Sequence, residues 1–200
     1  GNENSYSFIC INPVAEFIPS SKLYERLDLS LRENPLNEKD FEEVVKELVL
    51  ASTRTGTNAF FNQLFGGRNE DAILGELLSV ILNNSMYTYK AAGPQVGVEK
   101  SILRKVCDFI GWDKNADGTL APGGSMTNLM SMIMARDAAF PSANRQGMTE
   151  QMLVYTSKES HYSIAKNAAF SGIGRESVRF VPTDDQGRMD VSQLEKMIEE

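Results

Sequence analysis

Residues 152–200 alternate between short apolar runs and amphipathic stretches, and this alternation restricts the fold more than any other sequence feature. The runs at 152–156 and 178–181 have the length and the β-branched and aromatic content of buried strands, whereas 163–170 and 191–200 have helical spacing. A strand, a helix and a second strand of these lengths predict a right-handed crossover and a parallel sheet. The sequence therefore predicts an α/β domain.

The segment 121–128 places a proline, two glycines and three polar side chains in front of a long apolar, helix-favouring run. Pro122 and the glycines predict a turn, and the run from Leu129 predicts a helix to about Phe140. Glycines permit close approach of a ligand, and a helix start offers free N–H groups and partial positive charge to a phosphate. An ordinary loop with a helix cap has the same residues, so the segment alone leaves both interpretations open.

His161 is the single histidine of the chain and follows the first predicted strand. Ligands of open α/β sheets gather at the carboxyl ends of strands. An imidazole there can stack on a heteroaromatic ring, transfer a proton near neutral pH or bind a metal. Without a second histidine, paired cysteines or a nearby carboxylate set, we predict no metal site. The alternative for His161 is a surface or capping role.

Two segments resemble known ligand-binding motifs but lack residues that those motifs require. Residues 113–118 resemble the start of a calcium-binding loop, but the twelfth position is Gly124, which has no carboxylate. Residues 172–174 resemble part of a dinucleotide fingerprint, but they lack its third glycine and precede a strand instead of following one. We interpret the first as turns and the second as the end of a helix.

The N-terminal half is predicted to be helical after an irregular arm of about 36 residues, which Asn-Pro and Pro-Ser pairs interrupt. Asn37 and Asn69 are predicted to cap two helices. The second helix carries apolar residues over a wide face, so we expect it to be buried on most sides. The segment 86–94 is expected to be extended or irregular, and 98–110 to form a further helix.

Composition limits the class of partner and the compartment. The chain has 200 residues and a net charge of -7, and its basic residues are scattered, so we expect no nucleic-acid or anionic-membrane partner. Its apolar runs are far shorter than the roughly 20 residues of a membrane span. Two distant cysteines are typical of reduced thiols, and we recognise no secretory signal. We therefore predict a soluble, cytoplasmic protein.

The last ten residues predict a helix that has a start signal but no stop signal. Asp190 and Gln193 have the spacing of a capping box, and no C-cap residue follows before Glu200. We therefore expect the chain to be truncated, a fragment of a longer protein.

Four ordered segments resemble the group II pyridoxal-phosphate-dependent amino-acid decarboxylases. They read FFNQLFGG at 60–67, MYTY at 86–89, DGTLAPGGSMTNLMSMIMAR at 117–136 and YTSKESHYSIAKNAAFSGIG at 155–174. The resemblance runs from about residue 57 to residue 200. It implies decarboxylation of an acidic or related L-amino acid (aspartate, cysteine sulfinate, glutamate or 2,4-diaminobutyrate) to the corresponding amine and carbon dioxide.

The resemblance also implies an architecture and an assembly. The fold it implies is that of a fold-type-I pyridoxal-phosphate-dependent transferase-like large domain, with a mostly parallel sheet and flanking helices, and the assembly it implies is a homodimer. Residues 1–56 are then an N-terminal arm and helix that contact the partner. Residues 57–200 are the first, incomplete part of the large domain that binds pyridoxal 5'-phosphate.

The resemblance assigns the cofactor phosphate to three residues of the glycine segment, Gly124, Ser125 and Met126. It assigns His161, the expected catalytic residue, to stacking on the cofactor ring. The family's imine-forming lysine and its ring-binding aspartate belong to a region downstream of this one. Lys158 and Lys166 do not match that lysine, so the 200 residues alone are expected to be inactive.

The resemblance assigns substrate contacts to four further residues, namely Gln63, Phe65, Gly66 and Tyr87, the first three often across the dimer interface. Lys90 and a shifted Pro94 depart from the family's acidic residue and proline after the aromatic pair. Phe65 matches the cysteine sulfinate and aspartate enzymes better than the glutamate enzymes. Two other readings stay open: a non-catalytic fragment or homologue that acts as an oligomerisation or binding module, and another fold-type-I enzyme such as an aminotransferase or lyase.

Overall fold

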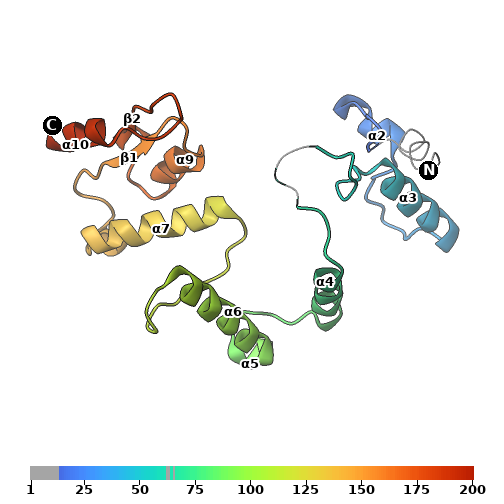
Figure 1. Ribbon diagram of the computed structural model, residues 1–200. Helices are drawn as coiled ribbons and strands as arrows, with labels where there is room; N and C mark the ends of the chain where they lie inside the picture. Colours follow the sequence, from blue (N-terminus) through green and yellow to red (C-terminus); the bar gives the residue numbers. More distant parts are fainter. Residues whose placement is uncertain (1–13, 62–63, 65) are drawn as a thin grey trace, which may run out of the picture. The chain divides into compact units, whose positions relative to one another are not determined.

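A computed structural model describes residues 14–61, 64 and 66–200 of the chain (Figure 1). The chain divides into two compact units, Gly1–Ser85 and Met86–Glu200. This division falls after Ser85 and does not test the predicted domain boundary after residue 56, which stays a prediction. Among the described residues, no helix combines the length and the apolar character that crossing a membrane requires.

The first unit contains η1 (Ser20–Lys22), α2 (Leu23–Arg26), α3 (Glu38–Ala51) and α4 (Glu70–Leu82). The expectation of an irregular arm is therefore wrong at 20–26, where two short helical turns form. Both predicted caps are confirmed: the side chain of Asn37 accepts a hydrogen bond from the N–H of Asp40, and Asn69 accepts one from Ala72, each at 2.9 Å. Each cap satisfies a backbone donor that the first turn leaves open.

The prediction that α4 is buried on most sides is wrong for the described chain. None of its residues is buried, and its large apolar side chains are exposed by between 45% at Ile73 and 76% at Ile81. The wide apolar face does indicate a helix whose apolar side chains pack against other polypeptide. Periodicity does not say which polypeptide or segment packs against the helix, and the described residues of its own unit do not bury it.

The second unit begins with α5 (Tyr89–Ala92) and α6 (Pro94–Ile110). The expectation of an extended or irregular 86–94 segment is wrong at 89–92, because Thr88 caps α5 through its hydroxyl oxygen, 3.3 Å from the N–H of Ala91. A helix of four residues is too short to show a period. Pro94 occupies the first turn of α6, where its missing N–H costs nothing, so α6 starts four residues before the predicted 98.

The sheet is a pair of parallel strands, as the sequence predicts. β1 (Val154–Ser157) pairs with β2 (Val178–Val181) in the register Val154↔Val178 to Ser157↔Val181. Between them run α9 (Ser163–Phe170) and η2 (Arg175–Ser177), and α10 (Val191–Glu199) follows β2. Asp190 accepts hydrogen bonds from the N–H groups of Ser192 and Gln193 and so caps α10.

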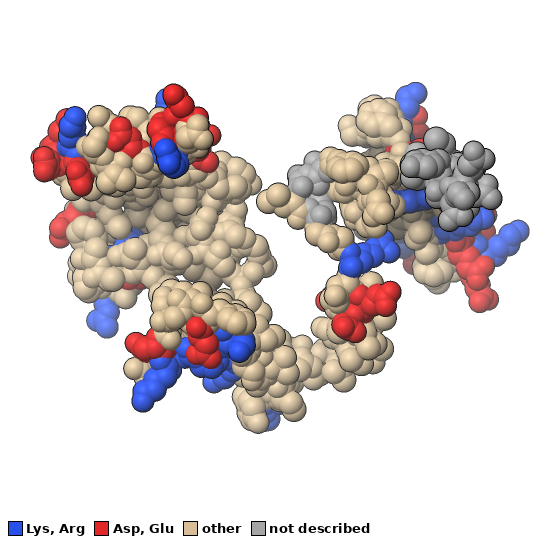
Figure 2. Space-filling model, in the orientation of Figure 1, with Lys and Arg blue, Asp and Glu red and all other residues tan. Residues whose placement is uncertain are grey.

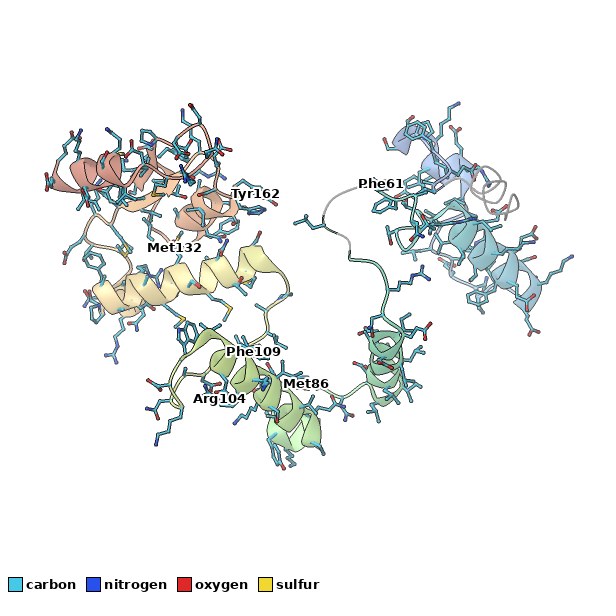
Figure 3. All side chains as sticks on the ribbon, in the orientation of Figure 1. Phe61, Met86, Arg104, Phe109, Met132 and Tyr162 are labelled. Atoms are coloured by element: carbon cyan, nitrogen blue, oxygen red, sulfur yellow. The ribbon has the colours of Figure 1, made fainter. Side chains whose placement is uncertain are left out.

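The core of the second unit lies where α7 (Gly124–Ala139) packs against α9 and the sheet (Figures 1 and 3). Met132 from α7 is buried there together with residues from α9, the following loop and β2, namely Ala168, Ile173 and Val178. Arg136 donates to the carbonyl oxygen of Ser171 at 2.5 Å and fastens the far end of α7 to the end of α9. The short α8 (Ala143–Gln146) follows α7.

Charged side chains of both signs intermingle on the face that Figure 2 shows. On α6, Arg104 pairs with Asp108 at 3.0 Å and also donates to carbonyl oxygens of the following turn, at Asp113 and Ala116. This interspersion agrees with the scattered basic residues of the sequence.

Candidate functional site

The N-terminus of α7 is open. The helix starts at Gly124, and Gly123 before it has φ 97° and ψ 156°, a backbone conformation that residues with a side chain rarely adopt. No side chain caps this helix, and the N–H groups of Gly124 and Ser125 have no hydrogen-bond partner among the described residues. A Cβ atom placed on Gly124 would meet nothing within 4 Å. The backbone donors of the first turn are therefore available to an anion.

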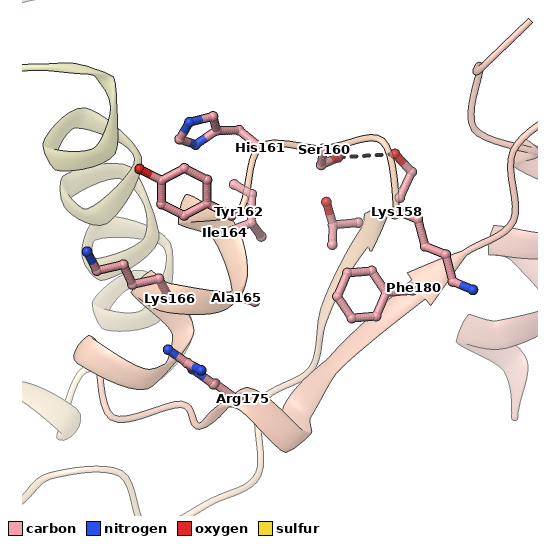
Figure 4. A pocket seen from close by; sticks show the side chains of 11 residues that line it. Lys158, Ser160, His161, Tyr162, Ile164, Ala165, Lys166, Arg175 and Phe180 are labelled. Carbon is pink, nitrogen blue, oxygen red and sulfur yellow. Dashed lines mark hydrogen bonds between the residues drawn. The ribbon is translucent and has the colours of Figure 1, made fainter. Parts of the chain in front are cut away.

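His161 lies in the turn that joins the carboxyl end of β1 to α9 (Figure 4). Ser157, the last residue of β1, and Ser160 share a hydrogen bond between their hydroxyls at 3.2 Å, which holds the turn. The rings of His161 and Tyr162 lie with their centroids 4.2 Å apart and their planes inclined by 34°. His161 lies at the strand end, as the sequence pattern predicts, and it is exposed there.

A buried serine connects His161 to α7. Ser163, the first residue of α9, is 0% exposed, and its hydroxyl lies 2.8 Å from Nδ1 of His161. The side-chain amide of Asn128 on α7 donates to the same hydroxyl oxygen at 2.9 Å. The backbone N–H of Ser163 also donates to Nδ1, at 3.2 Å. The imidazole is thus hydrogen-bonded along one edge.

A second polar contact joins α9 to the start of α7. Asn167 is 2% exposed, and its side-chain nitrogen donates to the backbone carbonyl oxygen of Ser125 at 2.8 Å. Two separate polar contacts thus join α9 to α7, one near the segment of Gly124, Ser125 and Met126 and one at the turn of His161. Both parts were predicted from the sequence, but the side chains that connect them were not.

A cavity of about 410 Å³ opens beside His161 (Figure 4). Its walls are the ends of β1 and β2 and one side of α9, with Tyr162 and Phe180 as aromatic lining and Lys158, Lys166 and Arg175 as basic lining. Its size suits a small ligand. Gly124, Ser125 and Met126 are not among its lining residues, so the cavity adjoins the ring of His161 and not the start of α7.

Of the four predicted substrate residues, the structure describes two, Gly66 and Tyr87. Gln63 and Phe65 lie outside the described residues. Gly66 is exposed and belongs to the first unit. Tyr87 is 89% exposed in the turn before α5 and does not line the cavity beside His161.

Within the part of the chain that the structure describes, no group of three or more histidine, cysteine, aspartate or glutamate side chains is arranged to hold a metal ion. The calcium-like segment is a turn, as interpreted. Asp113 accepts a hydrogen bond from the N–H of Asn115 at 2.6 Å, and Asp117 accepts one from Gly118 at 2.8 Å. Both carboxylates thus cap local backbone.

Sequence reasoning missed the roles of Ser163 and Asn167. The two lie four residues apart, and in a helix of 3.6 residues per turn this spacing puts them on one face, which is buried. A serine and an asparagine on a buried face require polar partners. That requirement is a usable signal, although it does not name Asn128 and Ser125 as the partners.

Together these features define a class of protein: an α/β domain with an open, phosphate-compatible helix start, hydrogen-bonded to the turn at a parallel strand end. The family described as "Pyridoxal-dependent decarboxylase conserved domain" matches residues 20–200. The chain belongs to this family, which confirms the resemblance drawn from the sequence motifs.

Individual relatives agree with the family. The chain is 38% identical to human cysteine sulfinic acid decarboxylase over 187 residues, which is 92% of this chain and 38% of that protein. It is 35% identical to the acidic amino acid decarboxylase of Xenopus tropicalis over 201 residues, 99% of this chain and 39% of that protein. The crystal structure of mouse CSAD superposes with a TM-score of 0.88 at 37% identity, covering 92% of this chain and 40% of the other. The chain has the fold of the pyridoxal-dependent decarboxylases and spans about two fifths of these relatives' length.

Proposed function

We propose that the protein is a pyridoxal-phosphate-dependent decarboxylase that converts an acidic or related L-amino acid to its amine and carbon dioxide. The observation that carries this proposal is the family match over residues 20–200. Identity of 38% to human cysteine sulfinic acid decarboxylase over 92% of the chain supports it.

Within this activity we propose aspartate or cysteine sulfinate as the substrate in preference to glutamate. The two relatives above are named for cysteine sulfinic acid and for acidic amino acids. Phe65 in the sequence supports the same choice, since a small residue is usual at this position in glutamate enzymes. Gln63, Phe65, Gly66 and Tyr87 are the residues we propose to contact the substrate.

The residues at the start of α7 fit the phosphate of the cofactor. Two backbone N–H groups there lack partners in the described chain, and the space above Gly124 is open. We propose that Gly124 and Ser125 bind the phosphate through these N–H groups, that Met126 flanks it, and that His161 covers the ring. When bound, pyridoxal phosphate accepts the electron pair that is released as carbon dioxide departs. The described residues bind and orient the cofactor and hold the imidazole edge.

We further propose that the protein acts as a homodimer in the cytoplasm. The apolar residues of α4, and those of α3 such as Phe41 and Val49, are exposed in the described chain and suit an interface with a second copy. Cys107 is a free, buried thiol, in keeping with a reducing compartment.

Product analysis tests the proposed reaction. The intact protein is supplied with pyridoxal phosphate and, separately, with aspartate, cysteine sulfinate, glutamate and 2,4-diaminobutyrate, and carbon dioxide and amine are quantified. We expect equal amounts of both products, most rapidly from aspartate or cysteine sulfinate. Release of no carbon dioxide from any of the four contradicts the proposal. A keto acid as the main product indicates an aminotransferase or a lyase instead.

A pair of serine variants tests the proposed phosphate site. In Ser125→Leu a bulky side chain stands at the open helix start, whereas in Ser131→Leu the same change is made at an exposed position further along α7. We expect Ser125→Leu to weaken pyridoxal phosphate binding about tenfold or more, because the larger side chain obstructs the approach of the phosphate to the backbone N–H groups, and loss of a single good hydrogen bond to an anion amounts to roughly 1.5–3 kcal/mol. Absorbance titration measures the affinity and circular dichroism the folding. Equal affinity in the two variants would remove Ser125 from the site.

A further inference from the structure

We propose that Asn128 and Ser163 are positioning residues that hold His161 as the neutral tautomer with its proton on Nε2. The edge of the imidazole that a ligand meets is then a hydrogen-bond donor. The role in ligand binding rests on the proposed function. The tautomer itself rests only on contacts within α7, α9 and the turn before α9.

The backbone of Ser163 gives the first argument. Its N–H group lies 3.2 Å from Nδ1 of His161. A backbone N–H donates and never accepts, so the nitrogen that it meets must present a lone pair. A proton on Nδ1 would point at another proton. This contact therefore favours the tautomer with the proton on Nε2.

The hydroxyl of Ser163 gives the second argument. Its oxygen lies 2.8 Å from Nδ1 and 2.9 Å from the side-chain nitrogen of Asn128. The amide nitrogen of an asparagine is a donor only, so the hydroxyl oxygen accepts from Asn128. Among the described residues this buried hydroxyl has no acceptor other than Nδ1 for its own single proton, so it donates that proton to Nδ1. Donation thus runs in one direction, from Asn128 through Ser163 to His161. The same direction follows from the backbone contact.

Burial makes the arrangement persistent. Ser163 is 0% exposed and starts α9, while Asn128 lies one turn into α7, so the network spans the packed interface of these two helices. Hydrogen bonds shielded from water are stronger than exposed ones. The histidine, although exposed itself, is anchored on the interior side of its ring, along the Nδ1 edge.

The consequence concerns the ligand. Nε2 has no hydrogen-bond partner among the described residues. A protonated Nε2 donates to an acceptor, such as a carboxylate, phosphate or phenolate oxygen, and does not bind a donor. The network of Asn128 and Ser163 therefore selects ligands that present an acceptor to His161.

The spectrum of the imidazole tests the tautomer directly. The intact protein is labelled with nitrogen-15 and its imidazole proton–nitrogen correlations are recorded without cofactor or substrate, at about pH 8.5, where an ordinary imidazole is neutral. The signals of His161 are those that vanish in His161→Gln. We expect an unprotonated Nδ1 and a protonated Nε2. A protonated Nδ1, or an even mixture of tautomers, overturns the proposal without any further variant.

Two substitutions test the residues that set the tautomer. Asn128→Asp keeps the shape of the side chain but replaces its donor by an acceptor, so the Ser163 hydroxyl turns toward the carboxylate and no longer donates to Nδ1. We expect the ratio of the Nε2–H to the Nδ1–H tautomer to fall at least fivefold. Ser160→Ala, which removes a hydroxyl that bonds to Ser157 and not to the imidazole, leaves the ratio unchanged. An unchanged ratio in a folded Asn128→Asp protein overturns the role of Asn128.

If Asn128→Asp does not fold, Ser163→Ala provides the decision, because it removes the hydroxyl and keeps the backbone N–H. We expect a smaller fall in the ratio, and an unchanged ratio counts against the hydroxyl. None of these spectra depends on catalysis. A protein with the expected tautomer that releases no carbon dioxide contradicts the proposed function alone, and a decarboxylase with the other tautomer contradicts this inference alone.

Discussion

A substitution at Gly123 tests the cost of backbone strain to stability, because at this position strain can be separated from steric contact. With φ 97° and ψ 156° it occupies a region that only glycine adopts readily, while a Cβ atom placed on it would meet nothing within 4 Å. Gly123→Ala therefore introduces backbone strain without a steric clash. Such strain amounts to about 1–3 kcal/mol, and the lower entropy of the unfolded alanine chain offsets about 0.4–1 kcal/mol of it. We expect a net destabilisation of about 1–2 kcal/mol.

Gly124 is the matched control. It is the first residue of α7, its φ is not in the left-handed region, and its Cβ would also meet nothing within 4 Å. Alanine is a better helix residue than glycine by up to about 1 kcal/mol, so Gly124→Ala should leave stability unchanged or raise it slightly. Two adjacent substitutions of equal size are thus expected to have different effects, for a conformational reason only.

Urea unfolding of the intact protein without cofactor measures both effects. With a slope of about 2 kcal/mol per molar urea, the middle of the usual range, the expected destabilisation lowers the midpoint of Gly123→Ala by about 0.5–1 M. The slope itself should not change, since both variants expose the same surface. A midpoint for Gly123→Ala equal to that of the unmodified protein would refute the argument from backbone strain. So would an equal loss of stability in Gly124→Ala.

Two further predictions concern the core and the last cap. Met132 is 9% exposed and Met134, on the same helix, is 70% exposed, so Met132→Ala should destabilise the protein by about 2–4 kcal/mol and Met134→Ala by less than about 0.5 kcal/mol in the same urea assay. The hydroxyl of Ser192 and the backbone N–H groups of Gln193 and Ser192 hold the pKa of Asp190 below its ordinary value of 3.8. Because this folded-state pKa is depressed, the stabilisation is present above pH 3.8 and is lost as the pH falls through the lowered pKa. Nuclear magnetic resonance titration of the folded protein measures the pKa of Asp190. A value at or above 3.8 would contradict this prediction.

Sequence patterns predicted best those elements whose signals are local. The caps at Asn37 and Asn69 and the helix at 163–170 follow from residues within one turn, and the structure has them at these positions. The parallel pairing of 154–157 with 178–181 followed from segment lengths and the alternation of strand and helix. In contrast, α5 is a single turn whose start depends on one Thr88 hydroxyl, and no period indicates it.

The candidate site was predictable in its parts and not in its connections. The glycines before α7 and the single histidine are visible in the sequence because few residue types have their properties. The partners of Ser163 and Asn167 lie 35 and 42 residues away in the chain, and only the packing of α7 on α9 brings them together. The burial of α4 was predicted wrongly for a related reason. An apolar pattern indicates that a helix face packs against something, but it does not identify the segment or chain that packs there.

The two polar contacts from α9 to α7 also fix how these helices can change. Ser163 meets Asn128 and Asn167 meets the carbonyl of Ser125 from the same side of α9. A shift of α9 by one residue along its axis turns this face by about 100° and breaks both contacts at once. We therefore expect insertions and deletions to be tolerated in the mostly exposed loop at 147–151 but not between Ser163 and Asn167. The four-residue spacing keeps the histidine turn and the start of α7 in the register that the proposed cofactor site requires.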